Sequence, residues 1–252
     1  MHEGFLTRPR PVSRPRFRLF LLHHAGGSSA GYRPWVRHFP ADWEVCLLEA
    51  PGRGRSAAEE PLRDARALAR RLREGLGAEL DRPFGLFGHS MGALLAYELA
   101  HLLVAEGPAR PTWLGASAWS PAPGPERDRP RHLLPSERLR QGIARMGGVA
   151  VGALSDPDQW RAVEPLIRAD LELVDTWRSR PDAPPLRVPL SVFGGVDDSG
   201  VPPGRLTPWS EYVEGAVDRH LLPGDHFYFV GRLADVAARI IQDVDAALGR
   251  VR

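Results

Sequence analysis

A serine flanked by glycines is the first feature of this chain that could do chemistry. Residues 88–92 read Gly-His-Ser-Met-Gly, which fits the pattern Gly-x-Ser-x-Gly around Ser90. A short apolar run at residues 84–88 leads into the motif, and a largely apolar stretch at residues 93–105 with helical character follows it. A serine at such a strand-to-helix turn has strained backbone geometry and an exposed hydroxyl, and the glycines avoid collisions with neighbouring backbone. We therefore predict that Ser90 is a nucleophile rather than an incidental serine of a glycine-rich turn.

A histidine near the end of the chain is the candidate general base. A serine hydroxyl is a poor nucleophile at neutral pH until a base removes its proton. His226 follows a predicted strand at residues 217–222 and precedes the closing helix, and the base occupies this loop when the chain order is serine, acid, histidine. Other histidines lie in the N-terminal tail or beside predicted helices and strands, without such a signal: His2, His38, His101, His132 and His220.

The third member of a triad is a carboxylate that orients the imidazole and stabilises its protonated form. The stretch Gly-Gly-Val-Asp-Asp directly follows a predicted strand, and counting Gly-x-x-Asp from its second glycine selects Asp198, with Asp197 as the alternative. Asp225 is adjacent to His226 in sequence and is poorly placed to bond that ring. Residues 119–123, which follow an earlier predicted strand, contain no carboxylate, and this favours Asp198.

Attack by a serine on an acyl group creates an oxyanion, which needs hydrogen-bond donors. Loss of one such donor typically lowers the rate about 10²–10³-fold. The backbone N–H of Met91, directly after the nucleophile, is one predicted donor. The second is the N–H of Ala25, in the turn His-Ala-Gly-Gly-Ser at residues 24–28 after the first predicted strand. The neighbouring His24 could orient this turn.

The elements that must position these residues alternate along the chain. Strands are expected at residues 18–23, 45–50, 84–88, 113–119, 189–195 and 217–222. Helices are expected along the repeat Leu68, Leu72, Leu76 and Leu80, at 93–105, 136–146 and 159–177, and through the closing apolar positions Val236 to Leu248. Alternating strands and helices predict a mostly parallel central sheet flanked by helices, which together with the motif indicates an α/β-hydrolase fold. Residues 121–182 interrupt the alternation, so we predict a helical lid insertion within a single domain spanning 1–252.

Composition limits the class of protein. A chain of 252 residues with 43% hydrophobic and 25% charged residues is typical of one globular α/β domain. The single cysteine, Cys46, excludes an internal disulfide, and its place in an apolar run predicts an inert core thiol. No apolar stretch approaches the length of a membrane-spanning helix, and no signal-peptide pattern opens the chain. We therefore expect a cytoplasmic protein without a membrane partner.

The charge distribution argues against nucleic-acid binding. The formal net charge is only +2, and the basic residues, all of them arginine, are scattered among acids. A local basic run near the N-terminus could be a solvated lead-in segment or a docking site for an acidic partner; it comprises Arg8, Arg10, Arg14, Arg16 and Arg18.

Five segments resemble the type II thioesterases that accompany polyketide synthases and nonribosomal peptide synthetases. They are residues 24–28 (His-Ala-Gly-Gly-Ser), 51–54 (Pro-Gly-Arg-Gly), 87–92 around the serine, 166–170 (Leu-Ile-Arg-Ala-Asp) and 223–227 (Pro-Gly-Asp-His-Phe). The resemblance implies a lid at the helical insertion and a stand-alone enzyme. It also implies that the substrates are acyl groups on the phosphopantetheine arm of an acyl or peptidyl carrier protein. The arm belongs to the partner, so no cofactor or metal is expected, and the default oligomeric state is a monomer.

Two departures and three alternatives accompany this resemblance. Many relatives have proline where His23 stands and proline where Ser199 stands, after the acid. A carboxylesterase or lipase acting on soluble oxygen esters would use the same triad, as would a cyclising thioesterase, whereas a non-catalytic protein on this fold would break it. The acyl preference is not predicted, because it depends on the volume under the lid. Three residues could line that chamber, but aromatic and aliphatic residues at helical spacing are more often core: Trp160, Leu166 and Trp177.

Overall fold

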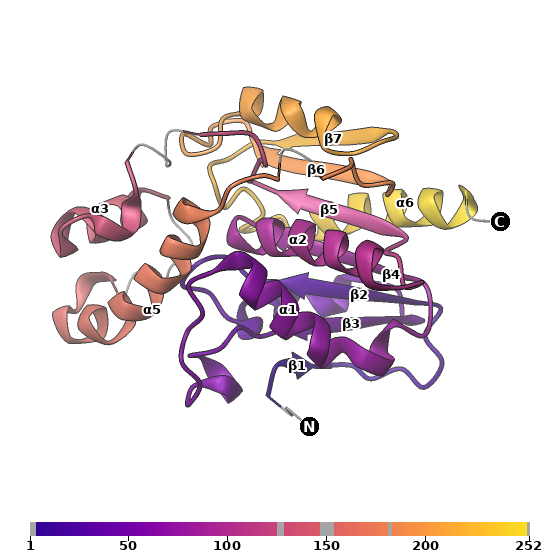
Figure 1. The fold of residues 1–252 in the computed structure, drawn as a ribbon, viewed down its shortest axis with the longest axis horizontal. Coiled ribbons are helices and arrows are strands. Elements are labelled where there is room, and N and C mark those ends of the chain that lie inside the picture. The colour runs from indigo at the N-terminus through magenta and orange to yellow at the C-terminus, as the bar shows by residue number, and fades with distance from the viewer. Residues whose placement is uncertain (1–3, 125–128, 147–153, 181–182, 251–252) are drawn as a thin grey trace.

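Seven strands form one sheet in the order β1-β3-β2-β4-β5-β6-β7 in the computed structural model, which describes residues 4–124, 129–146, 154–180 and 183–250 (Figure 1). Neighbouring strands are parallel, except that β1 and β3 are antiparallel. The predicted mostly parallel sheet is therefore confirmed. The strands are β1 Leu6–Thr7, β2 Phe17–Leu22, β3 Trp43–Leu48, β4 Phe84–His89, β5 Trp113–Ser117, β6 Leu190–Gly195 and β7 Val217–Leu222.

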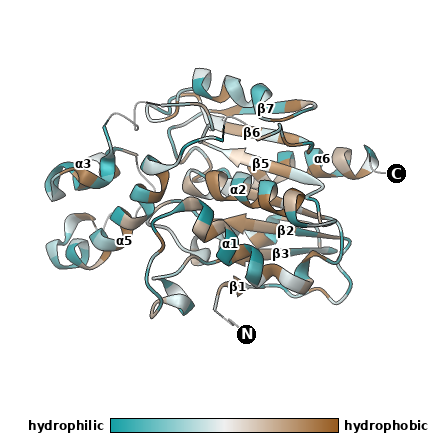
Figure 2. Cartoon of the chain, in the orientation of Figure 1, coloured by the Kyte–Doolittle hydropathy of each residue, from teal (hydrophilic) through white to brown (hydrophobic). Residues whose placement is uncertain are grey.

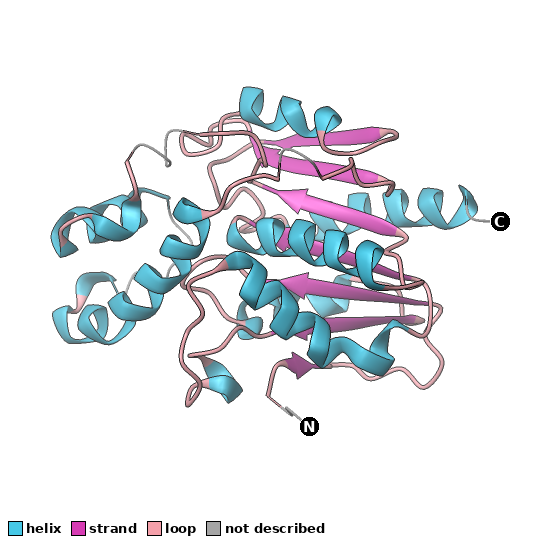
Figure 3. Cartoon of the chain, viewed as in Figure 1, coloured by secondary structure: helices cyan, strands magenta, loops and turns pink. Residues whose placement is uncertain are grey.

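Helices cover both faces of the sheet (Figures 1 and 3). Helices α1 (Ala65–Leu76) and α2 (Met91–Glu106) pack on one face, and α6 (Leu233–Arg250) with the 3-10 helix η1 (Ser29–His38) packs on the other. Alternate residues of a strand point to opposite faces, so Phe20 joins the first of these two apolar clusters and Leu19 joins the second. In Figure 2 the central strands are largely hydrophobic, α1 shows hydrophilic residues on its outer side, and α2 is hydrophobic along most of its length.

Helix α1 shows where periodicity stops being informative. Asp64 caps its first turn by accepting a hydrogen bond from the N–H of Ala67, and the leucine repeat is buried as far as Leu76. The prediction that the helix continues through Leu80 is wrong. Gly77, at φ +27°, ends the α-helix, and a 3-10 turn carries the chain to the next strand.

The segment between β5 and β6 contains helices α3 (Ser136–Met146) and α5 (Pro157–Thr176), with no strand in its described residues from 121 to 180. Both helices lie beyond the carboxyl ends of the strands (Figure 1). They share an apolar cluster of their own, separate from the two clusters on the sheet: Leu139, Ile143, Trp160, Ile167 and Leu171. We call α3 and α5 the insertion helices. That residues 121–182 act as a lid within one domain remains a prediction.

Four of the five N-terminal arginines bond other parts of the fold, which corrects for them the expectation of a solvated lead-in segment, whereas Arg14 is exposed. Arg18 binds Glu44 at 2.7 Å and Asp81 at 2.5 Å, and Arg8 also pairs with Glu79. Arg16 bonds Asp42 and Asp245, and Arg10 donates to backbone carbonyls near the start of β3. These bonds fasten the start of the chain to the amino end of the sheet, so the engaged guanidinium groups do not form an open docking site.

Two expectations from composition concern the single cysteine and membrane-spanning helices. Cys46 is a free, fully buried thiol in β3, and burial raises its pKa to about 12, so it stays protonated at neutral pH. This confirms the predicted core thiol. Within the described ranges, no helix is both long enough and apolar enough to cross a membrane.

Candidate active site

Ser90 lies at the sharp turn between β4 and α2. Its backbone has φ +56° and ψ −117°, a conformation that L-residues rarely adopt. The turn brings the chain so close to itself that a Cβ on Gly88 would overlap the carbonyl oxygen of Gly92, and a Cβ on Gly92 would overlap that of Leu22 in β2. Both glycines are therefore required by the backbone alone, as the motif predicts.

The structure brings Asp198, and not Asp197, against the ring of His226. The Nδ1–H of His226 donates to Oδ2 of Asp198 at 2.7 Å, whereas Asp197 is exposed. Oδ1 of Asp198 accepts from the N–H groups of Gly200 and Val201, both at 2.9 Å. Ser199, where the resemblance leads us to expect proline, is exposed and leaves these bonds intact.

Electrostatics favour an ionised carboxylate at Asp198. Burial opposes its charge, but the hydrogen bond and charge of His226 and the two backbone donors outweigh burial and lower the pKa of Asp198 below its ordinary value. A carboxylate only accepts hydrogen bonds, so the proton of the neutral imidazole resides on Nδ1 and leaves Nε2 free to accept one. Asp225 takes no part, because its Oδ1 accepts from the N–H of Phe227.

Ser90 and His226 line one small cavity of about 50 Å³. The insertion contributes Arg131, Met146 and Val174 to its wall. The remaining lining residues follow β5 and β6 along the chain, the last of them in a 3-10 helix: Ala118, Trp119, Ser120, Gly200, Val201 and Arg205.

The three residues considered for an acyl chamber do not line this cavity. Trp160 is buried among the insertion helices, and Trp177 is buried with its indole N–H donating to Glu98 at 2.6 Å. Leu166 packs toward Gly52. For all three, the alternative reading as core or packing residues is the one that the structure supports.

The turn after β2 contains the predicted donor Ala25. The carbonyl of His24 accepts from the ring Nδ1–H of His23 at 2.9 Å and from the N–H of Gly27 at 3.0 Å, and the carbonyl of Ala25 contacts Nδ1 of His24 at 2.9 Å. In contrast, the N–H groups of Ala25 and Met91 have no hydrogen-bond acceptor among the described residues. Met91 opens α2, and the first N–H groups of a helix have no partner one turn back. Both groups are therefore available to an oxyanion.

His23, where the resemblance leads us to expect proline, is a buried hydrogen-bonding side chain. Besides its bond to the His24 carbonyl, its Nε2 accepts from the N–H of Ala50 at 3.2 Å. Burial, reinforced by the positive charge of Arg53, lowers the pKa of His23 well below its ordinary value. The neutral ring links the turn to the end of β3 in a way that proline could not.

Sequence reasoning missed the role of His89, next to the nucleophile. His89 is fully buried, its Nδ1 lies 2.8 Å from the hydroxyl of Ser117, and that hydroxyl lies 2.6 Å from the hydroxyl of Tyr228. Its ring centroid is 4.9 Å from that of His226. Burial and the neighbouring imidazoles lower the pKa of His89 well below its ordinary value, so a neutral ring supports the base.

An ion pair joins α5 to the loop after β3. Its two residues belong to separate motifs in the sequence, which gave no sign that they pair. Arg53 and Asp170 make two bonds of 2.7 Å, and their side chains are 5% and 1% exposed. Asp170 also accepts from the N–H of Gly26 at 2.8 Å. The Pro-Gly-Arg-Gly and Leu-Ile-Arg-Ala-Asp motifs therefore meet at the turn that follows β2.

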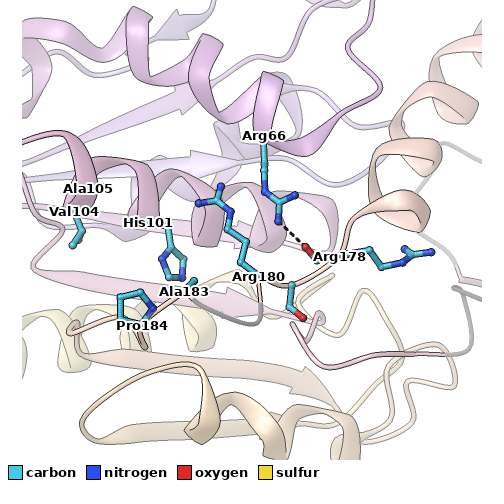
Figure 4. A pocket seen from close by; sticks show the side chains of 9 residues that line it. Arg66, His101, Val104, Ala105, Arg178, Arg180, Ala183 and Pro184 are labelled. Carbon is cyan, nitrogen blue, oxygen red and sulfur yellow. Dashed lines mark hydrogen bonds between the residues drawn. The ribbon is translucent and has the colours of Figure 1, made fainter.

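A larger cavity of about 630 Å³ lies away from Ser90, between α1, α2 and the chain after α5 (Figure 4). Arg66, Arg178 and Arg180 surround it, and Arg66 donates to the carbonyl of Arg178 at 2.6 Å. Burial and the charges of Arg180 and Arg66 lower the pKa of His101, which also lines it, to about 4. Among the described residues, no group of three or more His, Cys, Asp or Glu side chains could hold a metal ion.

Known proteins resemble this chain along nearly its whole length. The sequence profile of the family described as "Thioesterase domain" matches residues 17–245. Gramicidin S biosynthesis protein GrsT of Aneurinibacillus migulanus is 31% identical over 216 residues, covering 86% of this chain and 84% of GrsT. Two solved structures also superpose well. The type II thioesterase BorB from the borrelidin biosynthetic cluster has a TM-score of 0.85 at 32% identity, covering 96% of this chain and 98% of BorB. RedJ, a thioesterase from the prodiginine pathway of Streptomyces coelicolor, has a TM-score of 0.82 at 32% identity, covering 93% of this chain and 91% of RedJ.

Proposed function

The chain belongs to the thioesterase domain family, and from this premise we propose that it hydrolyses acyl thioesters on carrier proteins with Ser90, His226 and Asp198 as its catalytic triad. The observation that carries the proposal is the 2.7 Å bond between His226 and a buried carboxylate, beside a strained serine that lines the same cavity. That bond orients the imidazole and leaves its Nε2 available to take the serine proton.

In the first half of the proposed reaction, Oγ of Ser90 attacks the thioester carbonyl while Nε2 of His226 takes the hydroxyl proton. The carbonyl oxygen becomes an oxyanion that accepts hydrogen bonds from the N–H groups of Ala25 and Met91. The positive end of α2 points toward the same charge. The carbon–sulfur bond then breaks, the sulfur leaves as a thiol with the proton from His226, and an ester remains on Ser90.

In the second half, water hydrolyses the ester. His226 takes a proton from the attacking water, a second oxyanion forms between the same donors, and the proton returns to Oγ of Ser90 as the carboxylic acid leaves. Asp198 stays ionised throughout and stabilises the imidazolium in both halves. Every step uses groups of the protein, the thioester and water.

The carrier-bound substrate class is supported by the relatives. GrsT is a gramicidin S biosynthesis protein, and BorB is a type II thioesterase of the borrelidin cluster. We infer that this chain likewise removes acyl groups from the phosphopantetheine arm of an acyl or peptidyl carrier protein in polyketide or nonribosomal peptide biosynthesis. A lid formed by residues 121–182, a cytoplasmic location and a monomeric state remain predictions of the same proposal.

Mass spectrometry of acylated carrier proteins tests the substrate class. Carriers charged with several acyl groups are incubated with the wild-type protein, with its Ser90→Ala variant and with no protein. We expect the wild type alone to convert acyl carriers to free-thiol carriers, and to act more slowly on a soluble oxygen ester of the same acid. Faster hydrolysis of the oxygen ester, with intact acyl carriers, would instead identify a carboxylesterase or lipase.

A further inference from the structure

Two buried carboxylates hold the turn that follows β2, and they come from different parts of the molecule. Glu49, directly after β3, accepts from the N–H of Ser29 at 2.9 Å and from its hydroxyl at 2.7 Å. Asp170, on the insertion helix α5, accepts from the N–H of Gly26 at 2.8 Å. The far end of the turn is thus fastened to the sheet, whereas the end beside Ala25 is fastened to α5.

The peptide unit between Ala25 and Gly26 is held at both of its polar ends. Its carbonyl contacts the ring Nδ1 of His24 at 2.9 Å, and its N–H donates to Asp170. Side-chain packing adds a second contact with α5, because a Cβ on Gly26 would lie 2.9 Å from Cγ1 of Ile167. The orientation of this unit restricts the backbone torsions on either side of it, and with them the direction of the free N–H of Ala25.

Arg53 in turn fixes the position of Asp170. Its two terminal nitrogens bond one carboxylate oxygen each at 2.7 Å, and it also donates to the carbonyls of Gly27 and Pro51 at 3.1 and 3.3 Å. A planar, bidentate pair is more restrictive than a single charged contact. Arg53 therefore ties α5, the turn and the loop after β3 into one buried unit.

We propose that Asp170, held by Arg53, is a positioning residue for the oxyanion hole, and that α5 must be seated against the turn for hydrolysis to proceed. This inference rests on the function proposed above. It assigns to the insertion a role in catalysis besides contributing a cavity wall. When α5 moves away, the peptide unit at Gly26 loses its carboxylate partner, and the donor at Ala25 loses its fixed direction.

Asp170→Asn is the main test variant, with Asp243→Asn as its matched control. Asparagine keeps an oxygen for Gly26 but directs an N–H group at Arg53, so the pair loses its bidentate geometry. Asp243 is another buried carboxylate, 2.6 Å from Nε2 of His220, and it lies on α6 away from the turn. The control therefore reports the effect of neutralising a buried, hydrogen-bonded carboxylate without touching the oxyanion turn.

Kinetics on a soluble acyl thioester, which needs no carrier, give the first readout. We expect Asp170→Asn to lower kcat about tenfold, and Asp170→Ala up to about 100-fold, with KM changed less than about twofold, because only the oxyanion donor is displaced. The affinity of a boronic acid, which forms a tetrahedral adduct with the serine, should fall by the same factor as kcat. Asp243→Asn should stay within about twofold of the wild type.

Hydrogen exchange of the Gly26 amide gives a second readout that does not depend on activity. We expect faster exchange in Asp170→Asn than in the wild type and in Asp243→Asn. The inference is overturned if Asp170→Asn keeps wild-type kcat, boronate affinity and exchange at Gly26, or if any change equals that of the control. A wild type that does not hydrolyse thioesters would contradict the proposed function instead, and exchange at Gly26 would still decide whether Asp170 holds the turn.

Discussion

The nucleophile turn and the oxyanion turn meet at the same end of the sheet, yet they are held by different means. The turn at Ser90 is fixed by backbone contacts between β4, α2 and β2, which leave room only for Gly88 and Gly92. The turn at Ala25 has one internal backbone bond, from Gly27 to His24, and is fastened to the rest of the molecule by side chains, one of which, Asp170, comes from a helix outside the sheet. The first turn is therefore rigid whenever the sheet is folded, whereas the second depends on where α5 lies.

The largest expected effect is at the rigid turn. Ser90→Ala should lower thioester hydrolysis at least about 10⁴-fold without changing thermal stability by more than a few degrees, because only the nucleophilic hydroxyl is removed. Ser210→Ala, an exposed serine on the 3-10 helix η6 (Pro203–Glu211), is the control and should retain full activity. Steady-state kinetics and thermal melts of both variants provide the measurement. Retained hydrolysis in Ser90→Ala would show that the turn at Ser90 does not hold the nucleophile.

The acid comes next in size and has a neighbour in sequence as its control. Asp198→Asn should lower kcat about 10³–10⁴-fold, because an amide cannot hold the imidazole in the productive tautomer. Asp197→Asn should stay within about twofold of wild type, since Asp197 is exposed and its side chain does not face the ring. Equal losses in the two variants would mean that the carboxylate pairing differs from the one described.

Glycine-to-alanine variants compare the two turns directly. Gly92→Ala should prevent folding, because its methyl group would overlap backbone that cannot move. Gly26→Ala should fold and lose about tenfold in kcat, because its new methyl meets Cγ1 of the Ile167 side chain rather than backbone, and its φ of +71° is unfavourable for alanine. Adding Ile167→Ala should restore part of the activity. Circular dichroism checks folding and kinetics check activity. If the oxyanion turn were the rigid one, Gly26→Ala would fail to fold and Gly92→Ala would fold.

The smallest effect concerns pH and a histidine on α2. The folded-state pKa of His101 is about 4, below its unfolded value of about 6.5. As pH falls through 6.5, the His101 of the unfolded chain takes up a proton before that of the folded chain. The contribution of His101 to the free energy of unfolding is therefore fully present above that pH and is lost toward pH 4. Between pH 6.5 and pH 4, the free energy of unfolding of His101→Gln should fall by on the order of 1 kcal/mol less than that of the wild type. Urea unfolding at several pH values measures the difference. Identical pH dependence in both proteins would show that His101 titrates normally in the fold.

Local patterns explain what the sequence predicts about the fold. Six strands and the helices α1, α2, α3, α5 and α6 lie close to the predicted bounds, because apolar periodicity is set by neighbouring residues, whereas the 3-10 helices η1 and η6 were not predicted. The antiparallel strand β1 was missed because a strand of two residues shows no periodicity. The α-helix was predicted too long because the leucine repeat continues in the sequence to Leu80, although the α-helix ends at Gly77. The ion pairs of the N-terminal arginines were also missed, since their partners lie far along the chain.

In the site, too, residues within local motifs were predicted, and residues brought together by tertiary packing were not. Ser90, His226 and Asp198 were predicted from motifs at strand ends, and the spacing Gly-x-x-Asp selected the aspartate that the structure brings to the imidazole. Arg53 and Asp170 are separated by 117 positions, so no local pattern could pair them. The burial of His89 beneath the base likewise arises from packing, and its position beside the nucleophile was the only sequence signal available.

Trapping the acyl-enzyme would identify the nucleophile. The wild-type protein is mixed with an acylated carrier protein, quenched in acid within the first turnover and digested, and its peptides are analysed by mass spectrometry. We expect the acyl group on the hydroxyl of Ser90, and we expect it to accumulate in His226→Ala once that variant is slowly acylated. Hydrolysis that proceeds with no acyl group on Ser90, or with the label on another residue, would contradict this expectation.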